Sequence, residues 1–410
     1  MAKDGLFVGL DVGSTKVAAT CGEIVEGMVN IAGFVKVPND GMRKGVVTDI
    51  ESTISAISAA LEQLETLSAR PIRSAVVGIS GPHISTSISH GVVAVARADG
   101  EITATDIDRV IEAARTVALP PNREIIHVIP RSFTVDGQHS LDDPIGMTGI
   151  RLEVEALVIG GATSPIKNLT KCVYQAGLEI DDLVFSPLAT AHSILTKKQK
   201  EIGVALLDIG GGTTSLVVYE EGDILHSSVL PIGSSHITND LAIGLRTSVE
   251  IAEKIKIKYG SAIPDKIRES EVVSLAQFDP GEAQRIERKY ISEIIQARLG
   301  EIFALVSSDL KKIGKDGMLP AGMVLTGGGS KLEDLVEATK EELRLPAEIG
   351  SQIFEMGGFV DKLSDPLYAT SVGLLLYSLE NATRNGFSGH GNSSNNIISK
   401  TKNFFKQFLP

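Results

Sequence analysis

The chain has 410 residues, 43% hydrophobic and 22% charged, which are ordinary values for a globular protein of about two to three domains. Its 39 basic and 51 acidic residues give a formal net charge of −12, which argues against nucleic-acid binding through bulk positive charge. The two cysteines, Cys21 and Cys172, are too few for a disulfide framework, and no apolar stretch resembles a signal peptide or a transmembrane helix, so we expect a cytosolic protein.

The first predicted element is a β-hairpin with a glycine-rich turn, and the chain contains it twice. Residues 6–17 read LFVGLDVGSTKV, and residues 203–218 read GVALLDIGGGTTSLVV. Asp11 recurs as Asp208, and the glycines that follow keep the same offset. An apolar run, an Asp-x-Gly turn and a second apolar run are typical of a hairpin whose glycines allow a positive φ or a close ligand. The repeat predicts a duplicated fold with a site between the copies.

The rest of the chain alternates helical and strand-like periodicity, as in an α/β protein. A piece after the first strands carries its own strands and helix, which indicates an inserted α+β subdomain. We expect helices over 51–68, 106–117, 249–259 and 282–306, strands over 74–80, 124–129 and 152–159, and mainly helical structure over 236–300.

The glycine turns are suited to phosphate binding because they present backbone N–H groups without interfering side chains. The chain has no GxxxxGK[ST] loop, and GGGTTS at 210–215 lacks the third glycine of a dinucleotide fingerprint. A single Asp-x-Gly turn is usually just a tight hairpin. Two copies, together with TGGGS at 326–330, favour a nucleotide site in which the two aspartates hold hydrated Mg²⁺.

LDVGSTK, LDIGGGTT and LTGGGS resemble, in this order and spacing, the two phosphate motifs and the adenosine motif of the actin/Hsp70/sugar-kinase superfamily. The resemblance covers about residues 5–378 and includes PLATAHSIL at 187–195, DPLYATSVGLLLY at 365–377 and AEKIKIKYG at 252–260. It implies a two-lobed actin-like ATPase fold of the α/β class with an inserted small α+β subdomain, binding ATP and Mg²⁺. The implied site residues are Asp11 and Asp208 for Mg²⁺, Gly13, Ser14, Thr15 and Lys16 on one side of the phosphates, Gly210, Gly211, Gly212 and Thr213 on the other, Glu253 and Lys256 at the ribose, and Gly327, Gly328 and Gly329 at the adenosine.

The inserted piece, TDIEST at 48–53 and ISGPHI at 79–84 make the chain similar to the FtsA family of bacterial actin-like cell-division proteins. That resemblance implies filament formation with copies of itself, tethering of the tubulin-like protein FtsZ through its C-terminal peptide, and contacts with other division proteins. It also implies a peripheral location on the cytoplasmic face of the inner membrane at the division site.

The resemblance and the composition divide the chain into six parts. The expected parts are a first lobe over 1–82 with 163–198 and 350–380, an inserted subdomain over 83–162, a second-lobe core over 199–233 with 300–349, a helical partner-binding subdomain over 234–299, a flexible linker over 381–396 and an amphipathic helix over 397–410.

The last fourteen residues, IISKTKNFFKQFLP, carry no acid and follow a stretch rich in Gly, Ser and Asn. Helical spacing collects their large apolar residues on one face and their lysines beside it, as in a helix that lies in a membrane surface. A helix docked on the protein's own core is the alternative, although the linker argues against it. The predicted membrane residues are Ile397, Ile398, Phe404, Phe405, Phe408, Leu409, Lys400, Lys402 and Lys406.

Residues 246–298 carry ten basic and nine acidic side chains, whereas the rest of the chain is strongly acidic. The family resemblance places the site for the FtsZ peptide here, and arginines suit an acidic peptide. Ordinary solvated helix charges are an equally good account of any one of them. The candidates are Arg246, Arg268, Arg285, Arg288 and Lys289.

Hydrolysing relatives often carry Glu-Pro at the start of the first connecting helix, where this chain has Ser186-Pro187. Because a serine is a poor general base, we expect at most slow ATP hydrolysis, with ATP acting mainly as a structural ligand. Two other functions stay open: an actin-like type IV pilus assembly protein, which would lack the lipid-binding tail, and a small-molecule kinase, for which no catalytic base is identified.

Overall fold

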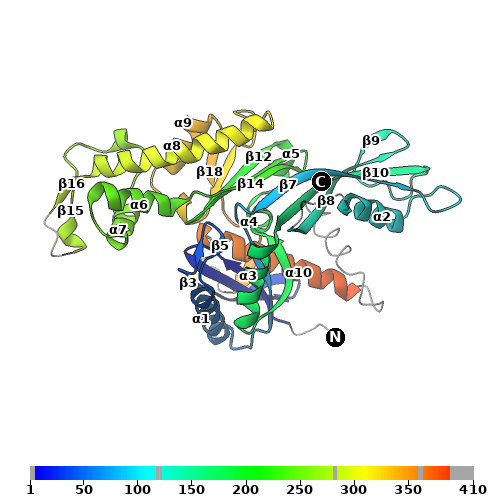
Figure 1. Ribbon diagram of the computed structural model, residues 1–410, viewed down its shortest axis with the longest axis horizontal. Coiled ribbons are helices and arrows are strands. Elements are labelled where there is room, and N and C mark those ends of the chain that lie inside the picture. The colour runs from blue at the N-terminus through cyan, green and yellow to red at the C-terminus, as the bar shows by residue number, and fades with distance from the viewer. Residues whose placement is uncertain (1–4, 117–119, 121, 280–283, 359–362, 388–410) are drawn as a thin grey trace.

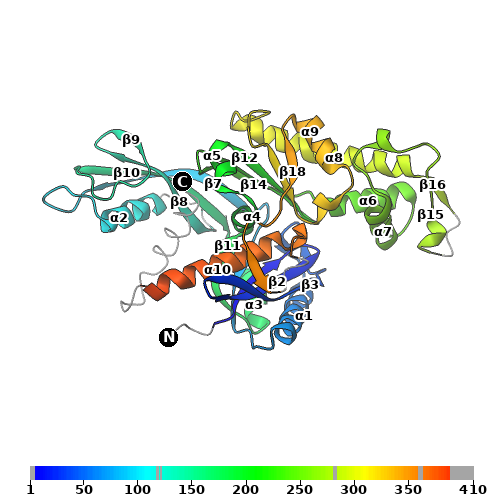
Figure 2. The same cartoon turned by 180° about the vertical axis from the view of Figure 1, so that it is seen from behind.

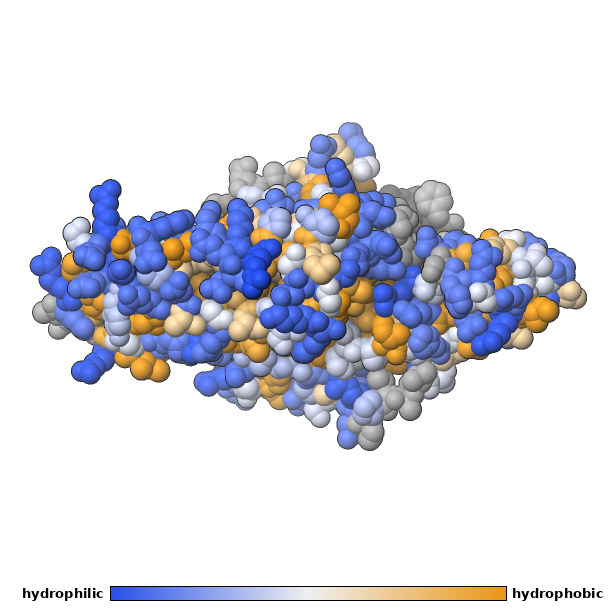
Figure 3. Space-filling model, turned by 90° about the horizontal axis from the view of Figure 1, so that it is seen from above, coloured by the Kyte–Doolittle hydropathy of each residue, from blue (hydrophilic) through white to orange (hydrophobic). Residues whose placement is uncertain are grey.

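The computed structural model describes residues 5–116, 120, 122–279, 284–358 and 363–387. Figures 1 and 2 show a lower lobe beneath an upper lobe, with a helical subdomain and an antiparallel sheet projecting at opposite ends of the upper lobe. Figure 3, seen from above, shows an elongated body on which hydrophobic residues are interspersed among hydrophilic ones. A helix able to cross a bilayer is not found in the described parts of the chain.

The lower lobe contains a mixed six-stranded sheet with helices on both faces. Its strand order is β11-β6-β1-β2-β3-β19, in which β1 and β2 form an antiparallel hairpin and β1 lies parallel to β6. Helices α1 and α3 pack on one face, and α10 packs on the other, where Val372 and Leu375 meet Ala18 and Ile31. The elements are β1 (Phe7–Val12), β2 (Lys16–Val25), β3 (Met28–Pro38), α1 (Ile50–Ser68), β6 (Ser74–Ile79), α3 (Thr163–Gln175), β11 (Glu179–Phe185), β19 (Met356–Gly358) and α10 (Ala369–Phe387).

The upper lobe repeats this topology with a five-stranded sheet of order β14-β13-β12-β17-β18. Here β12 pairs with β13 as the antiparallel hairpin and lies parallel to β17, which confirms the predicted duplication. Helices α8 and α9 cover one face, and α4 reaches the other from the first lobe. The elements are α4 (Ser186–Ile194), α5 (Lys197–Ile202), β12 (Val204–Ile209), β13 (Thr214–Glu220), β14 (Asp223–Leu230), α8 (Arg288–Lys312), β17 (Met323–Thr326), α9 (Leu335–Leu343) and β18 (Ala347–Ile349).

The inserted piece is an antiparallel sheet of order β7-β10-β8-β9 with one helix, α2, packed on it. The helix begins two residues before the predicted start, because the Thr103 hydroxyl and the Asp106 carboxylate form a capping box. The strands are also longer than predicted. The elements are β7 (Ile84–Ala94), α2 (Ala104–Arg115), β8 (Arg123–Val135), β9 (Gln138–Leu141) and β10 (Arg151–Ala162).

In the helical subdomain one sequence prediction is wrong. The helix expected over 282–306 instead runs from Arg288 to Lys312, and the three residues before it form β16, paired with β15. Ile286 is buried between exposed neighbours, which is the period-two pattern of a strand and depends on a partner that local periodicity does not show. The elements are α6 (Ser234–Leu245), α7 (Val249–Tyr259, as predicted), η1 (Pro264–Lys266), β15 (Val272–Ser274), η2 (Leu275–Gln277) and β16 (Arg285–Glu287); elsewhere lie β4 (Met42–Arg43), β5 (Val46–Val47), η3 (Gly328–Lys331) and η4 (Pro366–Tyr368).

Helices α4 and α10 cross between the two sheets at a point where only glycine fits. A Cβ on Gly373 would overlap the carbonyl oxygen of Ala189. A hydroxyl pair joins the helices beside the crossing, with Thr190 Oγ1 2.9 Å from Thr370 Oγ1. The crossing therefore depends on direct contact between backbones.

We predict that Gly373→Ala lowers the free energy of unfolding by about 1–3 kcal/mol, because the new methyl group forces α4 and α10 apart. Gly300→Ala on α8 is the matched control, since a Cβ there meets no atom within 4 Å. Alanine should leave that helix unchanged or stabilise it by up to about 1 kcal/mol. Denaturant titration measures both, and equal effects of the two substitutions would contradict the assigned crossing.

Candidate functional site

The first glycine turn joins β1 to β2 and is held from outside by the loop that follows β3. The Gly13 N–H donates to the Lys16 carbonyl at 2.9 Å and closes the turn. The buried Asn39 side chain donates to the Gly13 carbonyl at 2.8 Å, and the Gly45 N–H donates to Ser14 Oγ at 2.9 Å. Within the described residues, the N–H groups at positions 14 and 15 donate to no backbone carbonyl. They are therefore available to an anion.

The second glycine turn joins β12 to β13 and is fixed by the N-terminus of α6. The Gly210 N–H donates to the Thr213 carbonyl at 2.9 Å. The carbonyls of Gly210 and Gly211 accept from the first two N–H groups of α6, both at 2.9 Å. A Cβ on Gly233 would lie 2.6 Å from both carbonyl oxygens, so this close approach requires glycine. As in the first turn, the carbonyl side is occupied by the protein.

The two turns face each other across the lobes and are in contact. A Cβ on Gly211 would overlap the Thr15 side chain, and a Cβ on Gly212 would lie 2.7 Å from Ser14 Oγ. The structure thus brings together turns that lie almost 200 residues apart in the sequence. A side chain at either glycine would have to displace Thr15 or Ser14.

Two carboxyl groups, Asp11 and Asp208, lie at the ends of β1 and β12 beside the turns. Burial raises the pKa of both, and the charge of Asp11 further raises that of Asp208, to about 6, whereas Lys16 lowers both. Lys16 Nζ lies 3.8 Å from the Asp11 carboxylate and donates to the Leu367 carbonyl at 2.9 Å. Two carboxylates with one lysine form a site of net negative charge. Its oxygen donors fit Mg²⁺.

The third glycine segment packs against the strand that carries Asp208. Gly327 has φ of 81°, and a Cβ there would overlap the Asp208 carboxylate. A Cβ on Gly329 would overlap Ile209, and one on Gly328 would lie 3.0 Å from Leu367. The predicted adenosine segment is therefore adjacent to the predicted metal site.

Glu253 and Lys256 lie on α7 and face α6. Lys256 Nζ is 2.7 Å from the Glu253 carboxylate, donates to Thr238 Oγ1 at 2.8 Å and lies 3.3 Å from the Ser234 carbonyl. Since the Ser234 N–H is bonded to the second turn, these two side chains lie next to that turn. All fifteen predicted nucleotide residues belong to this one region or to the helix beside it.

Sequence reasoning missed the supports of the first turn and a partner of Asp208. Asn39 and Gly45 hold the turn, and the Thr370 hydroxyl donates to the Asp208 carboxylate. The glycines of PNDGMRKG at 38–45 were a detectable signal of a constrained loop. Thr370 gave no signal, because its role depends on where α10 packs.

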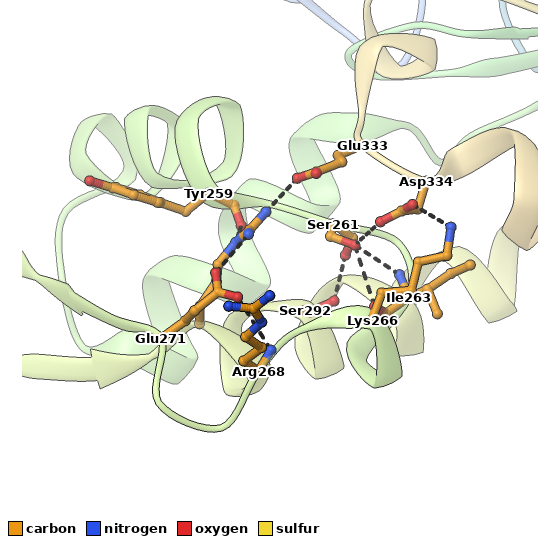
Figure 4. Close-up of polar contacts among 10 residues, drawn as sticks. Tyr259, Ser261, Ile263, Lys266, Arg268, Glu271, Ser292, Glu333 and Asp334 are labelled. Atoms are coloured by element: carbon orange, nitrogen blue, oxygen red, sulfur yellow. Dashed lines mark hydrogen bonds and ion pairs between the residues drawn. The ribbon is translucent and has the colours of Figure 1, made fainter.

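Of the five predicted partner residues, three are exposed, one is partly exposed and one bonds to other parts of the protein. Arg246, Arg268 and Arg285 are exposed, and Lys289 is partly exposed. Arg288 instead bonds to Glu271 at 2.9 Å, to Glu333 and to the Tyr259 carbonyl at 2.9 Å. Figure 4 shows Glu271, Glu333 and Tyr259 around this joint, which ties β15 and α7 to the loop before α9. Arg288 is therefore a structural joint of the subdomain.

Two further predictions concern the start of α4 and the chain's end. Ser186 is buried as the first residue of α4, and a Cβ on Gly78 would lie 2.7 Å from its Oγ.

The predicted membrane residues lie outside the described residues. They are Ile397, Ile398, Lys400, Lys402, Phe404, Phe405, Lys406, Phe408 and Leu409.

Comparisons with known proteins assign this chain to a family. The family model described as "Cell division protein FtsA" matches residues 205–373, and that of the "SHS2 domain inserted in FTSA" matches residues 81–160. The chain is 39% identical to cell division protein FtsA of Pseudomonas aeruginosa over 92% of this chain and 89% of that protein. It is 37% identical to the Bacillus subtilis protein of the same description, over 94% and 86%.

Solved structures share the fold at low sequence identity. The PilM-PilN type IV pilus biogenesis complex matches with a TM-score of 0.66 and 18% identity, over 91% of this chain and 98% of the other. MreB5 of Spiroplasma citri bound to ADP matches with a TM-score of 0.56 and 14% identity, over 94% and 99%. These likenesses confirm the predicted actin-like fold.

The raised pKa of Asp208 predicts a pH dependence of stability. Its carboxyl titrates near pH 6 in the folded state and near 3.8 ordinarily, so between these values the folded protein binds more protons than the unfolded chain. Stability should therefore fall as pH rises through this window, by up to about 1.4 kcal/mol per pH unit for one proton.

In Asp208→Asn the side chain at position 208 cannot titrate. The free energy of unfolding of this variant, relative to that of the wild type, should therefore increase from pH 4 to 6 and then level off. Denaturant titrations without nucleotide or divalent cations measure this difference. The exposed residue Asp265 supplies the control, Asp265→Asn, whose curve should parallel the wild type. Parallel curves for Asp208→Asn as well would refute the assigned burial of its charge.

Proposed function

The chain belongs to the FtsA family of cell-division proteins, and from this premise we propose that it binds ATP with Mg²⁺ and tethers FtsZ to the membrane as a polymer. The single observation that supports nucleotide binding is the pair of facing glycine turns with Asp11, Asp208 and Lys16 at their base. The proposed location is the cytoplasmic face of the cell membrane at the division site. Other division proteins are further proposed partners.

In this proposal the turn amides bind the phosphates. The N–H groups at positions 14, 15, 211 and 212 donate to phosphate oxygens. Hydrogen bonds from other parts of the protein to the turn carbonyls hold both turns in place for this contact. Asp11 and Asp208 hold the water shell of Mg²⁺, which offsets the phosphate charge when bound. Lys16 adds a positive charge at the same point. ATP bridging the turns stabilises the closed arrangement of the lobes.

Slow hydrolysis follows from the start of α4. Ser186 offers a hydroxyl and no carboxylate, so it is a weak general base for an attacking water. We infer that ATP serves mainly as a ligand that favours the polymer-competent state. A small-molecule kinase on this fold would need a base beside an acceptor, and the described residues offer no candidate that we can assign to that role.

The C-terminal segment is the proposed membrane anchor. Burial of several large apolar side chains in the lipid surface, aided by three lysines, gives reversible binding. Reversible binding by single copies favours a polymer, because linked anchors act together. The tail also distinguishes this function from that of a pilus assembly protein, whose structural likeness is only 18% identical.

The proposed surface for the FtsZ peptide lies on the helical subdomain. Arg246, Arg268, Arg285 and Lys289 supply accessible positive charge for an acidic peptide. Arg288 contributes indirectly, by holding β15, α7 and the loop before α9 together. Its partners Glu271 and Glu333 leave no net positive charge there for a peptide.

We predict that Lys16→Ala lowers the affinity for ATP with Mg²⁺ by about tenfold or more, because it removes a charge-assisted contact. Asp11→Asn should reduce the gain in affinity that Mg²⁺ provides and affect metal-free ATP much less. Calorimetry with and without EDTA measures both. Lys311→Ala, on the exposed end of α8, is the control that should bind as the wild type does. Failure of the wild type to bind ATP would remove the nucleotide part of the proposal.

The tail prediction is tested by co-sedimentation with vesicles that contain anionic lipid, in the presence of ATP and FtsZ. Full-length protein should pellet and bring FtsZ down, whereas a chain ending at Asn396 should not. Phe404→Glu with Phe408→Glu should release the protein, and Phe404→Leu with Phe408→Leu should retain it, because leucine keeps the apolar face. Pelleting of the protein without FtsZ would contradict the partner assignment, and equal sedimentation of all variants would contradict the anchor.

A further inference from the structure

The segment between β6 and β7, residues 80–83, contacts three parts of the molecule at once. It follows β6, which lies parallel to β1 in the first-lobe sheet, and leads into the inserted subdomain. The proposed function gives it no role, although it contains two groups with unusual surroundings, the Ser80 hydroxyl and the His83 ring.

Its first contact is with the loop that supports the first glycine turn. A Cβ on Gly45 would lie 2.6 Å from the Ser80 carbonyl oxygen and 2.8 Å from the Gly81 Cα. The Gly45 N–H is bonded to Ser14 Oγ. Gly45 thus lies between Ser14 and the Ser80–Gly81 backbone and contacts both. The first turn is therefore in close-packed contact with this backbone through Gly45.

Its second contact is with the second glycine turn. Ser80 Oγ lies 3.4 Å from Ser215 Oγ, which belongs to the start of β13 in the other lobe. Ser215 is buried two residues after Thr213, the last residue of the turn. The hydroxyl pair therefore spans the two lobes next to the proposed phosphate site and depends on their separation.

Its third contact is with both chain crossings into the inserted subdomain. The His83 carbonyl accepts from the Ala162 N–H at 3.2 Å and from Arg123 Nη2 at 3.1 Å. The same Arg123 nitrogen donates to Ser85 Oγ at 2.6 Å and to the Gly160 carbonyl at 2.9 Å. The start of β7, the end of β10 and the start of β8 are thus bonded around His83.

The His83 ring fills the space above Gly81. A Cβ on Gly81 would lie 2.6 Å from His83 Nδ1, and both ring nitrogens are buried without a hydrogen-bond partner among the described residues. Burial and the Arg123 charge lower the pKa of the ring to about 4, so it is neutral at pH 7. A buried imidazole without polar partners costs stability, which points to a role in positioning.

The inserted subdomain also docks on the second lobe. Thr86 Oγ1 donates to the Ser227 carbonyl at 3.2 Å, joining β7 to β14. The subdomain is therefore bonded to the first lobe around His83 and to the second lobe at Thr86. Ile84, Ile129, Leu157 and Ile159 of its strands also pack in the main core with residues of both lobes, so the subdomain is in contact with both.

We propose that residues 80–83 relay the state of the phosphate turns to the inserted subdomain, with Ser80 and His83 as positioning residues. When the turns close, the Ser80–Ser215 pair forms and the Ser80–Gly81 backbone is held against Gly45. His83 transmits this position to the crossing strands and sets how β7 docks on β14. The proposal rests on the proposed binding of ATP between the turns, since only a ligand that distinguishes the two arrangements shifts their populations.

Amide hydrogen exchange tests the relay on the full-length protein, with ATP and Mg²⁺ present or absent. In the wild type, ATP should slow exchange in β7 and β10 by about fivefold or more. Ser80→Ala and His83→Ala should bind ATP within about threefold of wild-type affinity by calorimetry, while losing most of this response. Ser87→Ala, at an exposed position of β7, is the control and should respond as the wild type does.

A full response in both Ser80→Ala and His83→Ala would overturn the relay. ATP binding by the wild type without slower exchange in β7 and β10 would overturn it as well, and would leave the proposed function standing. Absence of ATP binding in the calorimeter would remove the nucleotide part of the proposed function and the relay together.

Discussion

The close contact of the two glycine turns is the constraint on which the rest of the structure depends. Thr15 and Ser14 lie against Gly211 and Gly212 so closely that a Cβ at either glycine would overlap their side chains. The carbonyls of Gly13, Thr15, Gly210 and Gly211 accept hydrogen bonds from other parts of the protein, and within the described residues the N–H groups at positions 14 and 15 donate to no backbone carbonyl. The same contact brings Asp11 near Asp208 and creates a buried concentration of negative charge. The chemistry of the site is thus a consequence of how closely two backbones approach.

A second close approach, between α4 and α10, complements the first. Gly373 lies directly against the Ala189 carbonyl, and Ser193 Oγ donates to the Ala369 carbonyl at 2.9 Å. Since α4 packs on the second sheet and α10 on the first, their crossing connects the lobes. Thr370 of α10 also bonds to Asp208, so the crossing and the acid pair are in direct contact. Changes at the site are therefore coupled to the packing of the lobes.

The two projecting subdomains are attached in different ways. The helical subdomain is continuous with the hydrophobic core of the second lobe through α8 and is braced by Arg288. The inserted subdomain has a hydrophobic core of its own, and it meets the lobes through polar contacts around His83 and Thr86 and through Ile84, Ile129, Leu157 and Ile159, which join the main core. Each projecting subdomain is therefore joined to the lobes by apolar packing as well as by polar contacts.

The sequence by itself determined the features that depend on local pattern. The repeated Asp-x-Gly hairpins predicted the duplicated sheets, helical periodicity predicted α7 to the residue, and the glycine motifs identified the segments of the site. Only the tertiary structure decided which distant groups meet. It paired β15 with β16, placed Arg288 between two glutamates, and brought Asn39, Gly45 and Thr370 to the site. The physical reason is that periodicity and turn chemistry act over a few residues, whereas such contacts depend on how whole elements pack.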